Sequence, residues 1–574
     1  MIKILKGLSA YKWIVLAILG LVFIQSMADL FLPTLMADII DKGVVVGDIP
    51  YIWKIGGVML VVSAFSALAS VVASFYSSKA AMGLGRDIRR NVFKHVESFS
   101  LQDFDKVGTA SLITRTTNDI TQVQQFVIMM LRMVISAPIM FVGGLIMALS
   151  KDVKLSLIIV AAMPILIGSI LLILHKGMPL FQTVQKRLDR LNLVLRENLT
   201  GVRVVRAFNR EKEEQVRLRK ANKELTDVSI KVNKLMAFLM PIMMLVMNLT
   251  VVGVIWFGGI RIESGGMQIG DLMAYIQYVM LIMFSLVMAS MMFVMVPRAA
   301  VSAKRINEVL EMEPTFLDEG TEKADKERGT LEFEHVSFNY PGAEEQALTD
   351  ISFKAKSGEI TAIIGGTGAG KTTLVNLIPR FFELTSGIIR VNGVDIKKSS
   401  QDEVRSKIGF VPQKALLFSG TIAENIRFGK QDATQAEIEH AARIAQAEDF
   451  ITNMKDGYES TISQGGSNVS GGQKQRLSIA RALVRKPDIY IFDDSFSALD
   501  YKTDASLRAA LKEEIKDAAV VIVAQRVSTV IDADQILVLD KGQIAGMGTH
   551  QELLETNSVY REIVESQLSE EDIA

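Results

Sequence analysis

The chain has 574 residues, a length that exceeds one hydrophobic core and indicates at least two domains. Its 63 Lys and Arg residues balance 63 Asp and Glu residues, so the charge gives no reason to expect nucleic acid as a partner. The absence of cysteine excludes disulfides and thiolate metal sites, and the five histidines lack the spacing of a metal-binding motif.

Six apolar stretches occupy the first three hundred residues, and each is long enough to cross a bilayer core, which takes roughly 20 residues. Helices that are apolar on all faces do not suit a soluble core, so we expect six membrane spans. The first stretch is too long for a signal peptide and lacks a cleavage pattern. The expected spans cover about 13–39, 53–78, 122–149, 153–175, 236–259 and 270–297.

Lysine and arginine are concentrated in the two long loops that follow the second and fourth spans. Such loops stay on the cytoplasmic side, so we expect both loops and both termini in the cytoplasm, with the spans in the cell membrane. Segments 80–98 and 185–235 keep apolar residues at helical spacing among these charges, which predicts that the membrane helices continue into the cytoplasm. They end in turns near 100–108 and 201–209, within reach of a soluble domain.

One carboxylate, Asp29, lies inside the first span, where an unpaired charge is costly. Either it faces a water-filled cavity and binds a cation or a proton, or it pairs with a neighbouring helix or a partner chain. The last two spans are rich in methionine, whose flexible side chains suit varied apolar ligands and lipid-facing packing equally well. These residues are Met243, Met244, Met247, Met283, Met288, Met291 and Met292, with Phe284 and Phe293.

A charged connector over 311–328 precedes short β-branched runs that alternate with helical stretches, which predicts a parallel sheet covered by helices. The apolar run 360–364 leads into a phosphate-binding loop whose glycines turn backbone N–H groups toward phosphates at a helix N-terminus. We expect Lys371 to reach the terminal phosphates and the Thr372 hydroxyl to meet Mg²⁺. The loop residues are Gly365, Gly366, Thr367, Gly368, Ala369, Gly370, Lys371, Thr372 and Thr373.

Two further motifs complete this half of the chain. The strand 489–492 ends in Asp493, a carboxylate placed to ligate a phosphate-bound Mg²⁺. Small residues before the helix 473–485 offer a second anion-binding surface. Two phosphate-facing surfaces in one domain fit a nucleotide held between two such domains. The second surface consists of Ser470, Gly471, Gly472 and Gln473.

The order of these motifs resembles that of ABC transporters of the exporter type, over essentially the whole chain. The run 470–473 matches the family signature, Gln413 the Q-loop residue that senses Mg²⁺, and 497–500 the D-loop, which ends in Asp500. Tyr340 matches the aromatic residue that stacks on adenine. Segment 196–208 resembles the coupling loop that docks in the partner chain's nucleotide domain.

The resemblance implies an all-α six-helix transmembrane domain over 1–310, fused to an α/β P-loop nucleotide-binding domain over 329–574. It implies ATP and Mg²⁺ as cofactors, with Thr372, Gln413 and Asp493 around the metal ion.

Three positions depart from the family pattern. Asp494 replaces the glutamate that polarises the attacking water, and its carboxylate retreats by roughly 1.5 Å. Gln525 replaces the switch histidine and cannot titrate, and Gln464 replaces a glutamate before the signature. The departures predict a site that binds ATP and rarely hydrolyses it. The signature residues and Asp500 would then complete the hydrolysing site of a partner chain.

Within the family, this pattern resembles the degenerate-site subunit of heterodimeric bacterial multidrug exporters. It implies a homologous partner with the catalytic glutamate and switch histidine, and lipophilic substrates moved out of the cytoplasm or inner leaflet. The rival interpretations are a homodimeric lipid or peptide exporter and an ATP-gated regulatory or channel module. An importer is disfavoured, because importer ATPase domains are usually separate chains.

Overall fold

The structure is a computed structural model that describes residues 1–315, 318, 320–323 and 326–567, without the side chains of residues 174, 290, 291, 293 and 294. The chain divides into two compact units. One comprises residues 1–97 and 108–312, and the other comprises 98–107 and 313–574. Segment 98–107, which lies between helices of the first unit in the sequence, groups with the C-terminal unit.

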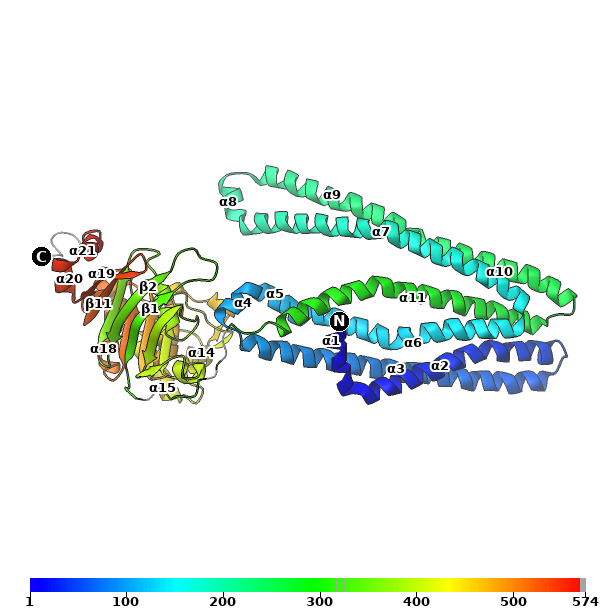
Figure 1. Ribbon diagram of the computed structural model, residues 1–574, viewed down its shortest axis with the longest axis horizontal. Coiled ribbons are helices and arrows are strands. Elements are labelled where there is room, and N and C mark those ends of the chain that lie inside the picture. Colours follow the sequence, from blue (N-terminus) through cyan, green and yellow to red (C-terminus); the bar gives the residue numbers. More distant parts are fainter. Residues whose placement is uncertain (316–317, 319, 324–325, 568–574) are drawn as a thin grey trace. The chain divides into compact units, whose positions relative to one another are not determined.

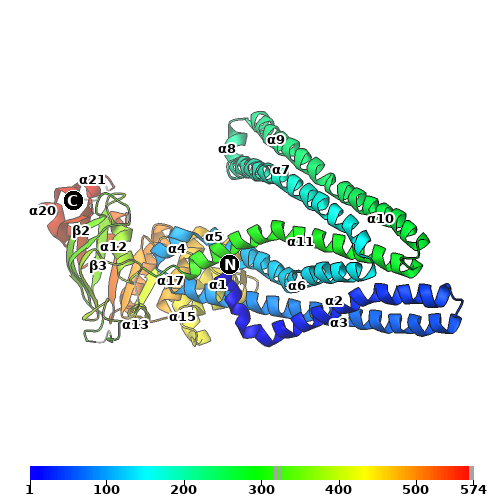
Figure 2. The ribbon, with the colours of Figure 1, turned by 45° about the vertical axis from the view of Figure 1, so that its right-hand side comes forward.

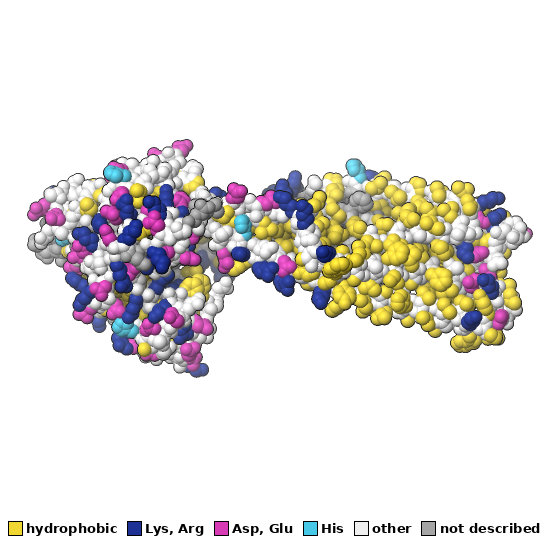
Figure 3. All heavy atoms as spheres, turned by 60° about the horizontal axis from the view of Figure 1, so that its bottom comes forward, with side chains coloured by type: hydrophobic (Ala, Val, Ile, Leu, Met, Phe, Trp, Pro, Cys, Tyr) yellow, Lys and Arg dark blue, Asp and Glu magenta, His cyan; other side chains and the backbone are white. Residues whose placement is uncertain are grey.

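The first unit is entirely helical and contains six helices that are long and apolar enough to cross a membrane. Hydrophobic side chains cover its middle, and charged side chains gather toward the helix ends (Figure 3). This distribution matches a hydrocarbon layer between two aqueous phases. The long helices are α2 (Lys12–Asp38), α3 (Ile49–Glu97), α6 (Ile120–Lys151), α7 (Val153–Thr200), α9 (Glu211–Ala237), α10 (Leu239–Glu263) and α11 (Ile269–Leu310).

Short elements connect these helices at both ends. The predicted turn near 201–209 contains the one-turn helix α8 (Val202–Ala207). Two π-helical segments, η2 (Ile39–Val44) and η3 (Arg115–Asp119), flank α2 and α6. The other short elements are α1 (Ile2–Leu5), η1 (Lys6–Tyr11) and α5 (Thr109–Thr114).

The long helices pack in pairs: α2 with α3, α6 with α11, and α7 with α9 and α10. Figures 1 and 2 show that α7, together with α9 and α10, diverges from the other helices of this unit toward the end that carries α8. The apolar side chains around α8 are consequently exposed, with Leu199 at 72%, Val204 at 61% and Phe208 at 73%. An apolar tip outside the expected membrane spans is typical of a docking site.

The second unit is built around a six-stranded sheet in the order β12-β11-β3-β10-β9-β6, which is parallel except for its edge strand β12. All residues of β9 and β10 are buried, because helices and a second sheet cover its two faces. The strands are β3 (Ile360–Gly365), β6 (Ile408–Val411), β9 (Ile489–Asp493), β10 (Ala519–Val523), β11 (Gln535–Asp540) and β12 (Gln543–Gly548).

A four-stranded antiparallel sheet packs on one face of this core in the order β2-β1-β4-β5. Its strands are β1 (Leu331–Phe338), β2 (Leu348–Ala355), β4 (Ser386–Val391) and β5 (Val394–Asp395), and β7 (Gly420–Thr421) pairs separately with β8 (Thr461–Ile462). The helices are α4 (Leu101–Val107), α12 (Lys371–Leu377), α13 (Gln401–Ser406), α14 (Ile422–Arg427), α15 (Gln435–Ile444), α16 (Glu448–Thr452), α17 (Gly471–Leu483), α18 (Tyr501–Glu514), α19 (Val527–Val530), α20 (His550–Thr556) and α21 (Ser558–Glu565), with 3₁₀ turns η4 (Gly457–Glu459) and η5 (Gln464–Gly466). The predicted fold class, an all-α six-helix membrane domain fused to an α/β domain, is confirmed.

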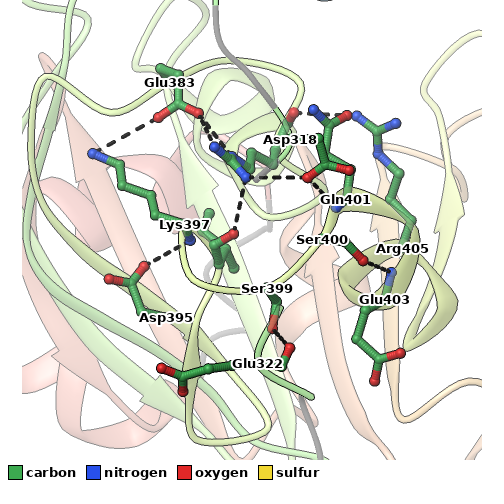
Figure 4. Close-up of polar contacts among 12 residues, drawn as sticks. Asp318, Glu322, Glu383, Asp395, Lys397, Ser399, Ser400, Gln401, Glu403 and Arg405 are labelled. Carbon is green, nitrogen blue, oxygen red and sulfur yellow. Dashed lines mark hydrogen bonds and ion pairs between the residues drawn. The ribbon is translucent and has the colours of Figure 1, made fainter. Parts of the chain in front are cut away.

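The described part of the connector is tied to the α/β domain. Asp318 accepts a hydrogen bond from the backbone N–H of Gln401 (2.8 Å) at the start of α13 (Figure 4). The Ser399 hydroxyl donates to the Glu322 carbonyl, and Arg380 lies 3.8 Å from the Asp318 carboxylate. The connector therefore follows the domain surface at these residues.

Segment 98–107 is held within the second unit by Asp103, which is 1% exposed. Its carboxylate accepts hydrogen bonds from the Ser100 hydroxyl (2.7 Å), the Thr315 backbone N–H (2.9 Å) and the Thr315 hydroxyl. Burial alone would raise the pKa of Asp103, but the bonds from Thr315 and Ser100 outweigh it and hold the pKa well below its usual range.

Candidate functional site

The phosphate-binding loop joins β3 to α12, in the strand-to-helix context that the motif requires. Gly370 has a φ of +97°, and a Cβ there would lie 2.9 Å from Leu348 Cδ2, so only glycine fits the start of α12. A Cβ at Gly366 or Gly368 would meet no atom within 4 Å, which leaves one side of the loop open. The loop therefore fits a phosphate chain held by backbone N–H groups.

Lys371 lies across this loop and donates hydrogen bonds to the carbonyls of Gly365 and Gly366, both at 2.7 Å. Burial lowers the pKa of its ammonium group, while the carboxylates of Asp494 and Asp493 oppose that shift. The positive charge thus sits between the loop and the two carboxylates, where it can move onto phosphate oxygens.

Thr372 and Asp493 form the expected magnesium position. The Thr372 hydroxyl donates to Asp493 Oδ1 at 3.1 Å, so the two oxygen ligands are already adjacent. Burial raises the pKa of Asp493 to about 6, the neighbouring Asp494 adds to this shift, and Thr372 and Lys371 oppose it. A divalent cation would reverse this penalty. These residues therefore fit Mg²⁺ bound to nucleotide phosphates.

Asp494 receives two side-chain amides on one carboxylate oxygen. Gln525 Nε2 donates to Asp494 Oδ2 at 2.7 Å, and Gln413 Nε2 donates to the same atom at 3.2 Å. Asp494 is 8% exposed, and its φ of +46° is the left-handed conformation that follows the end of β9. Asp494 and Gln525, at the positions of the family's glutamate and switch histidine, therefore meet the Q-loop residue Gln413 at one carboxylate.

The carboxyl ends of parallel strands explain this meeting. Gln413 follows β6, Asp493 ends β9 and Asp494 follows it, and Gln525 follows β10. All of them therefore reach the same edge of the sheet as the phosphate loop. Tyr340 also reaches this edge: its hydroxyl lies 3.0 Å from the Thr373 hydroxyl, and its ring packs edge-on against Phe382.

The signature residues lie at the N-terminus of α17. The Ser470 side chain caps the helix by accepting a hydrogen bond from the Gln473 backbone N–H, and the Gln473 side-chain oxygen accepts one from the Ser470 backbone N–H. A Cβ on Gly472 would lie 3.3 Å from the Ala498 carbonyl, so the signature and D-loop are neighbours. Asp500 caps α18 through the N–H and hydroxyl of Thr503.

The signature residues and the phosphate loop are not linked to each other within the described part of this chain. Among the hydrogen bonds of the described residues, none joins the signature to the phosphate loop. Gly471 is exposed, and a Cβ there would meet no atom within 4 Å. The signature is therefore an open helix N-terminus within the single chain.

Asp29 lies in the wall of a cavity between α2, α6 and α11 of the helical unit. The Ser66 hydroxyl of α3 donates to Asp29 Oδ1 at 2.7 Å. Asp29 therefore has a partner on a neighbouring helix, as one of the two interpretations expected, but this partner is uncharged. Met288 and Phe284 line the same cavity, and Met283 is buried in the core. The side chains of Met291 and Phe293 lie outside the described residues.

Two residues near these sites were missed by the sequence analysis. Arg132 lines the same cavity as Asp29. The sequence pattern that could have identified it is a single charged residue inside the third apolar stretch. Gln567, after α21, donates to the Gln525 carbonyl (2.8 Å) and accepts from the Val527 N–H (2.9 Å). These two hydrogen bonds hold the segment 525–527 in place, and no local sequence pattern predicts this role of Gln567.

Family models match both halves of the chain: ABC transporter transmembrane region over residues 15–308, and ABC transporter over residues 348–497. An uncharacterised ABC transporter ATP-binding protein of Mycobacterium tuberculosis (strain CDC 1551 / Oshkosh) is 41% identical over 97% of this chain and 96% of its own length.

Two other relatives have more specific names. A fatty acid ABC transporter ATP-binding/permease protein of Mycobacterium bovis is 35% identical over 82% of this chain and 75% of its own length. A multidrug resistance ABC transporter ATP-binding and permease protein of Lactococcus lactis is 31% identical over 88% of this chain and 85% of its own length.

A solved bacterial Atm1-family ABC exporter with ATP bound has the same fold, with a TM-score of 0.82 at 24% identity, covering 98% of this chain and 99% of its own. With the six apolar helices, the phosphate loop and the signature in one chain, this protein is a multi-pass membrane protein of the ABC transporter family that has the exporter fold.

Proposed function

We propose that this chain is one subunit of a heterodimeric exporter in the cell membrane, with both termini in the cytoplasm. Its own site, made of Tyr340, the loop 365–373, Asp493 and Asp494, holds ATP with Mg²⁺ and hydrolyses it slowly. Its signature and Asp500 complete a second site with the phosphate loop and catalytic glutamate of the partner. ATP binding closes the pair, and hydrolysis at the second site resets it.

The carboxylate of Asp494 carries this proposal. A general base must reach the water whose proton it accepts, and Asp494 Oδ2 already receives the amides of Gln525 and Gln413. Both donors hold the carboxylate near the strand end. A shorter side chain held in this way is a poor match for a water beside the γ-phosphate, so slow hydrolysis follows.

The open signature supports the second half of the proposal. Ser470 and Gly471 present an exposed helix N-terminus, which suits an anion supplied from another chain. The intact signature would then contribute to ATP hydrolysis at the partner's site, even though the base of this chain's own site is weak.

The cytoplasmic tip and a groove of the α/β domain support a partner that differs from this chain. The groove, of about 250 Å³, is lined by Phe381, Phe410, Phe428 and by Arg405, Arg481 and Arg485, with no acidic residue among its described lining residues. The tip around α8 carries Arg203 and Arg206, whereas Arg210 is paired with Glu213 at 3.2 Å. Like charges disfavour docking of this tip into this groove of a second copy, so we expect the partner's tip to be less basic.

A lipophilic substrate is supported by two observations. The cavity between α2, α6 and α11 is mostly apolar and rich in methionine. One relative is named for fatty acid transport and another for multidrug resistance, and fatty acids are lipophilic.

The proposal is tested by reconstituting the chain in lipid vesicles, alone and with a homologous partner that carries the catalytic glutamate. We expect the chain alone to bind ATP with little hydrolysis, and the pair to hydrolyse ATP and accumulate a lipophilic dye. Full ATP-driven dye transport by the chain alone would establish the homodimeric exporter instead. ATP binding that opens an ion conductance without dye transport would establish the channel.

A further inference from the structure

The cavity in the helical unit has an unusual distribution of charge. It has a volume of about 440 Å³ and is walled mainly by apolar side chains, among them Met129, Met133 and Met288. Asp29 from α2 and Arg132 from α6 are the charged residues of its described lining. A carboxylate and a guanidinium within an apolar membrane domain are costly, and such charges mark binding sites or ion paths.

Each charge has only a neutral partner in the part of the chain that the structure describes. Asp29 accepts from the Ser66 hydroxyl at 2.7 Å, and Arg132 Nη1 donates to Ser74 Oγ at 3.4 Å. Neither belongs to an ion pair with another described residue. Hydroxyl groups reduce the cost of a desolvated charge, but they do not neutralise it.

The two charges also lie at different depths. Ser66 and Ser74 belong to the same helix, α3, and are eight residues apart, which corresponds to about 12 Å along the helix axis. Asp29 lies at the level of Ser66, toward the α2–α3 hairpin, and Arg132 lies at the level of Ser74, toward the other end. A direct ion pair, which needs the charged atoms within about 4 Å, does not fit these contacts.

We propose that this cavity binds a dipolar amphiphile, with an ammonium group at Asp29 and a carboxylate or phosphate group at Arg132. The methionines that line the cavity would cover its apolar body. A ligand with one charge leaves the opposite wall charge desolvated and without a counter-charge, whereas a dipolar ligand neutralises both. This assignment rests on the proposed exporter function and narrows its substrate class from lipophilic compounds in general.

The test measures equilibrium binding to the full chain in nanodiscs, with empty nanodiscs subtracted. The three labelled probes are 10-aminodecanoate, decylamine and decanoate, which share a chain length and differ in charge. We expect 10-aminodecanoate to bind most tightly. Asp29→Asn should weaken 10-aminodecanoate and decylamine about tenfold and spare decanoate, because each charge-assisted hydrogen bond is worth about that factor.

Arg132→Gln should show the reverse selectivity: weaker 10-aminodecanoate and decanoate, with decylamine unchanged. Asp38→Asn on α2 and Arg298→Gln on α11 are matched controls, because neither residue lines the cavity, and they should change no probe. Nucleotide binding of every variant checks that the chain is folded.

Three outcomes overturn the dipolar assignment. Equal loss of all probes would mean a structural role for both residues. A response of decylamine alone, or of decanoate alone, would mean a site for a lipophilic cation or anion. The proposed exporter function is judged separately by ATP-driven dye transport in vesicles. Charge-selective binding without ATP-driven transport of either the dye or 10-aminodecanoate refutes the exporter, and transport without charge-selective binding refutes the dipolar site.

Discussion

Asp494 differs from a catalytic glutamate by one methylene, and its surroundings enlarge the effect of that difference. The left-handed backbone at the end of β9 fixes the direction of the side chain. The side-chain amides of Gln413 and Gln525 both donate to one carboxylate oxygen. A change at a single position would leave the rest of the family pattern in place, whereas here Asp494 and Gln525, at the positions of the family's glutamate and histidine, depart together and contact each other.

Replacing Asp494 with glutamate is therefore expected to raise ATP turnover at this site by about tenfold. A misplacement of about 1 Å can lower a reaction rate about 100-fold. The longer side chain is expected to recover only part of this factor, because Gln525 still replaces histidine. The measurement is steady-state ATP hydrolysis by the complex, with the partner's catalytic glutamate changed to glutamine so that only this site is counted. Asp517→Glu, at an exposed loop position, is the matched control and should change nothing.

A high rate in the complex that retains Asp494 while the partner's glutamate is inactivated would contradict this account. It would show that Asp494 serves as a competent base.

At the level of secondary-structure elements, the same capping geometry occurs at a helix N-terminus that belongs to the signature and at one that does not. Ser470 with Gln473 on α17 and Thr434 with Glu437 on α15 both form reciprocal capping boxes. Only the first belongs to the signature. The pair separates the loss of a helix cap from the loss of a nucleotide contact.

We expect Ser470→Ala and Thr434→Ala to lower the unfolding free energy by a similar amount, about 1 kcal/mol. If the proposed heterodimer is correct, only Ser470→Ala should reduce its ATP hydrolysis, by about tenfold or more, because the change would remove the proposed contact to the partner's nucleotide. Thermal unfolding and ATP turnover of both variants measure the two effects. Equal turnover in the two variants would contradict a role of Ser470 in the shared site.

Segment 98–107 is a second element whose position rests on one residue. Asp103 joins α4 to the start of the connector through Ser100 and Thr315. The unfolded chain takes up a proton at this carboxyl near pH 4, whereas the folded chain, with its lowered pKa, resists protonation. The unfolded state then binds more protons, so the contribution of Asp103 to stability is present at neutral pH and falls below about pH 4.

Asp103→Asn is expected to lower the unfolding free energy of the α/β domain by about 2 kcal/mol at pH 7, because it weakens several hydrogen bonds to a buried charge. The difference between the variant and the unmodified chain should shrink as the pH falls below about 4. Thermal unfolding across this pH range measures it. Asp105→Asn on the exposed face of the same helix should give no difference at any pH.

At the scale of the whole molecule, the membrane orientation rests on where Lys and Arg are placed. The hairpin between α10 and α11 and the tip between α8 and α9 belong to opposite ends of the helical unit. The basic tip is expected in the cytoplasm.

The natural chain contains no cysteine, so single cysteines report this orientation without background. We expect a membrane-impermeant maleimide to label Ser264→Cys in intact cells. Lys212→Cys, which is exposed near the start of α9, should be labelled only after lysis. The unmodified chain is the control. Labelling of Lys212→Cys in intact cells would contradict the cytoplasmic assignment of the basic loops.

Hydropathy and short motifs predicted the fold class and the family. Six apolar helices follow from the free energy of transfer into the bilayer, which depends on local composition alone. The phosphate loop and the signature are short contiguous motifs, so they are legible without tertiary structure. The substitutions at Asp494 and Gln525 were also visible in the sequence, because the motifs around them set the register.

Tertiary structure decided the contacts between distant residues. Gln413 and Gln525 meet Asp494 across 81 and 31 positions, and Thr315 meets Asp103 across 212. Arg132 faces Ser74 across 58 positions and shares its cavity with Asp29. These contacts depend on strand register and on helix rotation within the bundle, and neither is encoded in any short stretch of sequence.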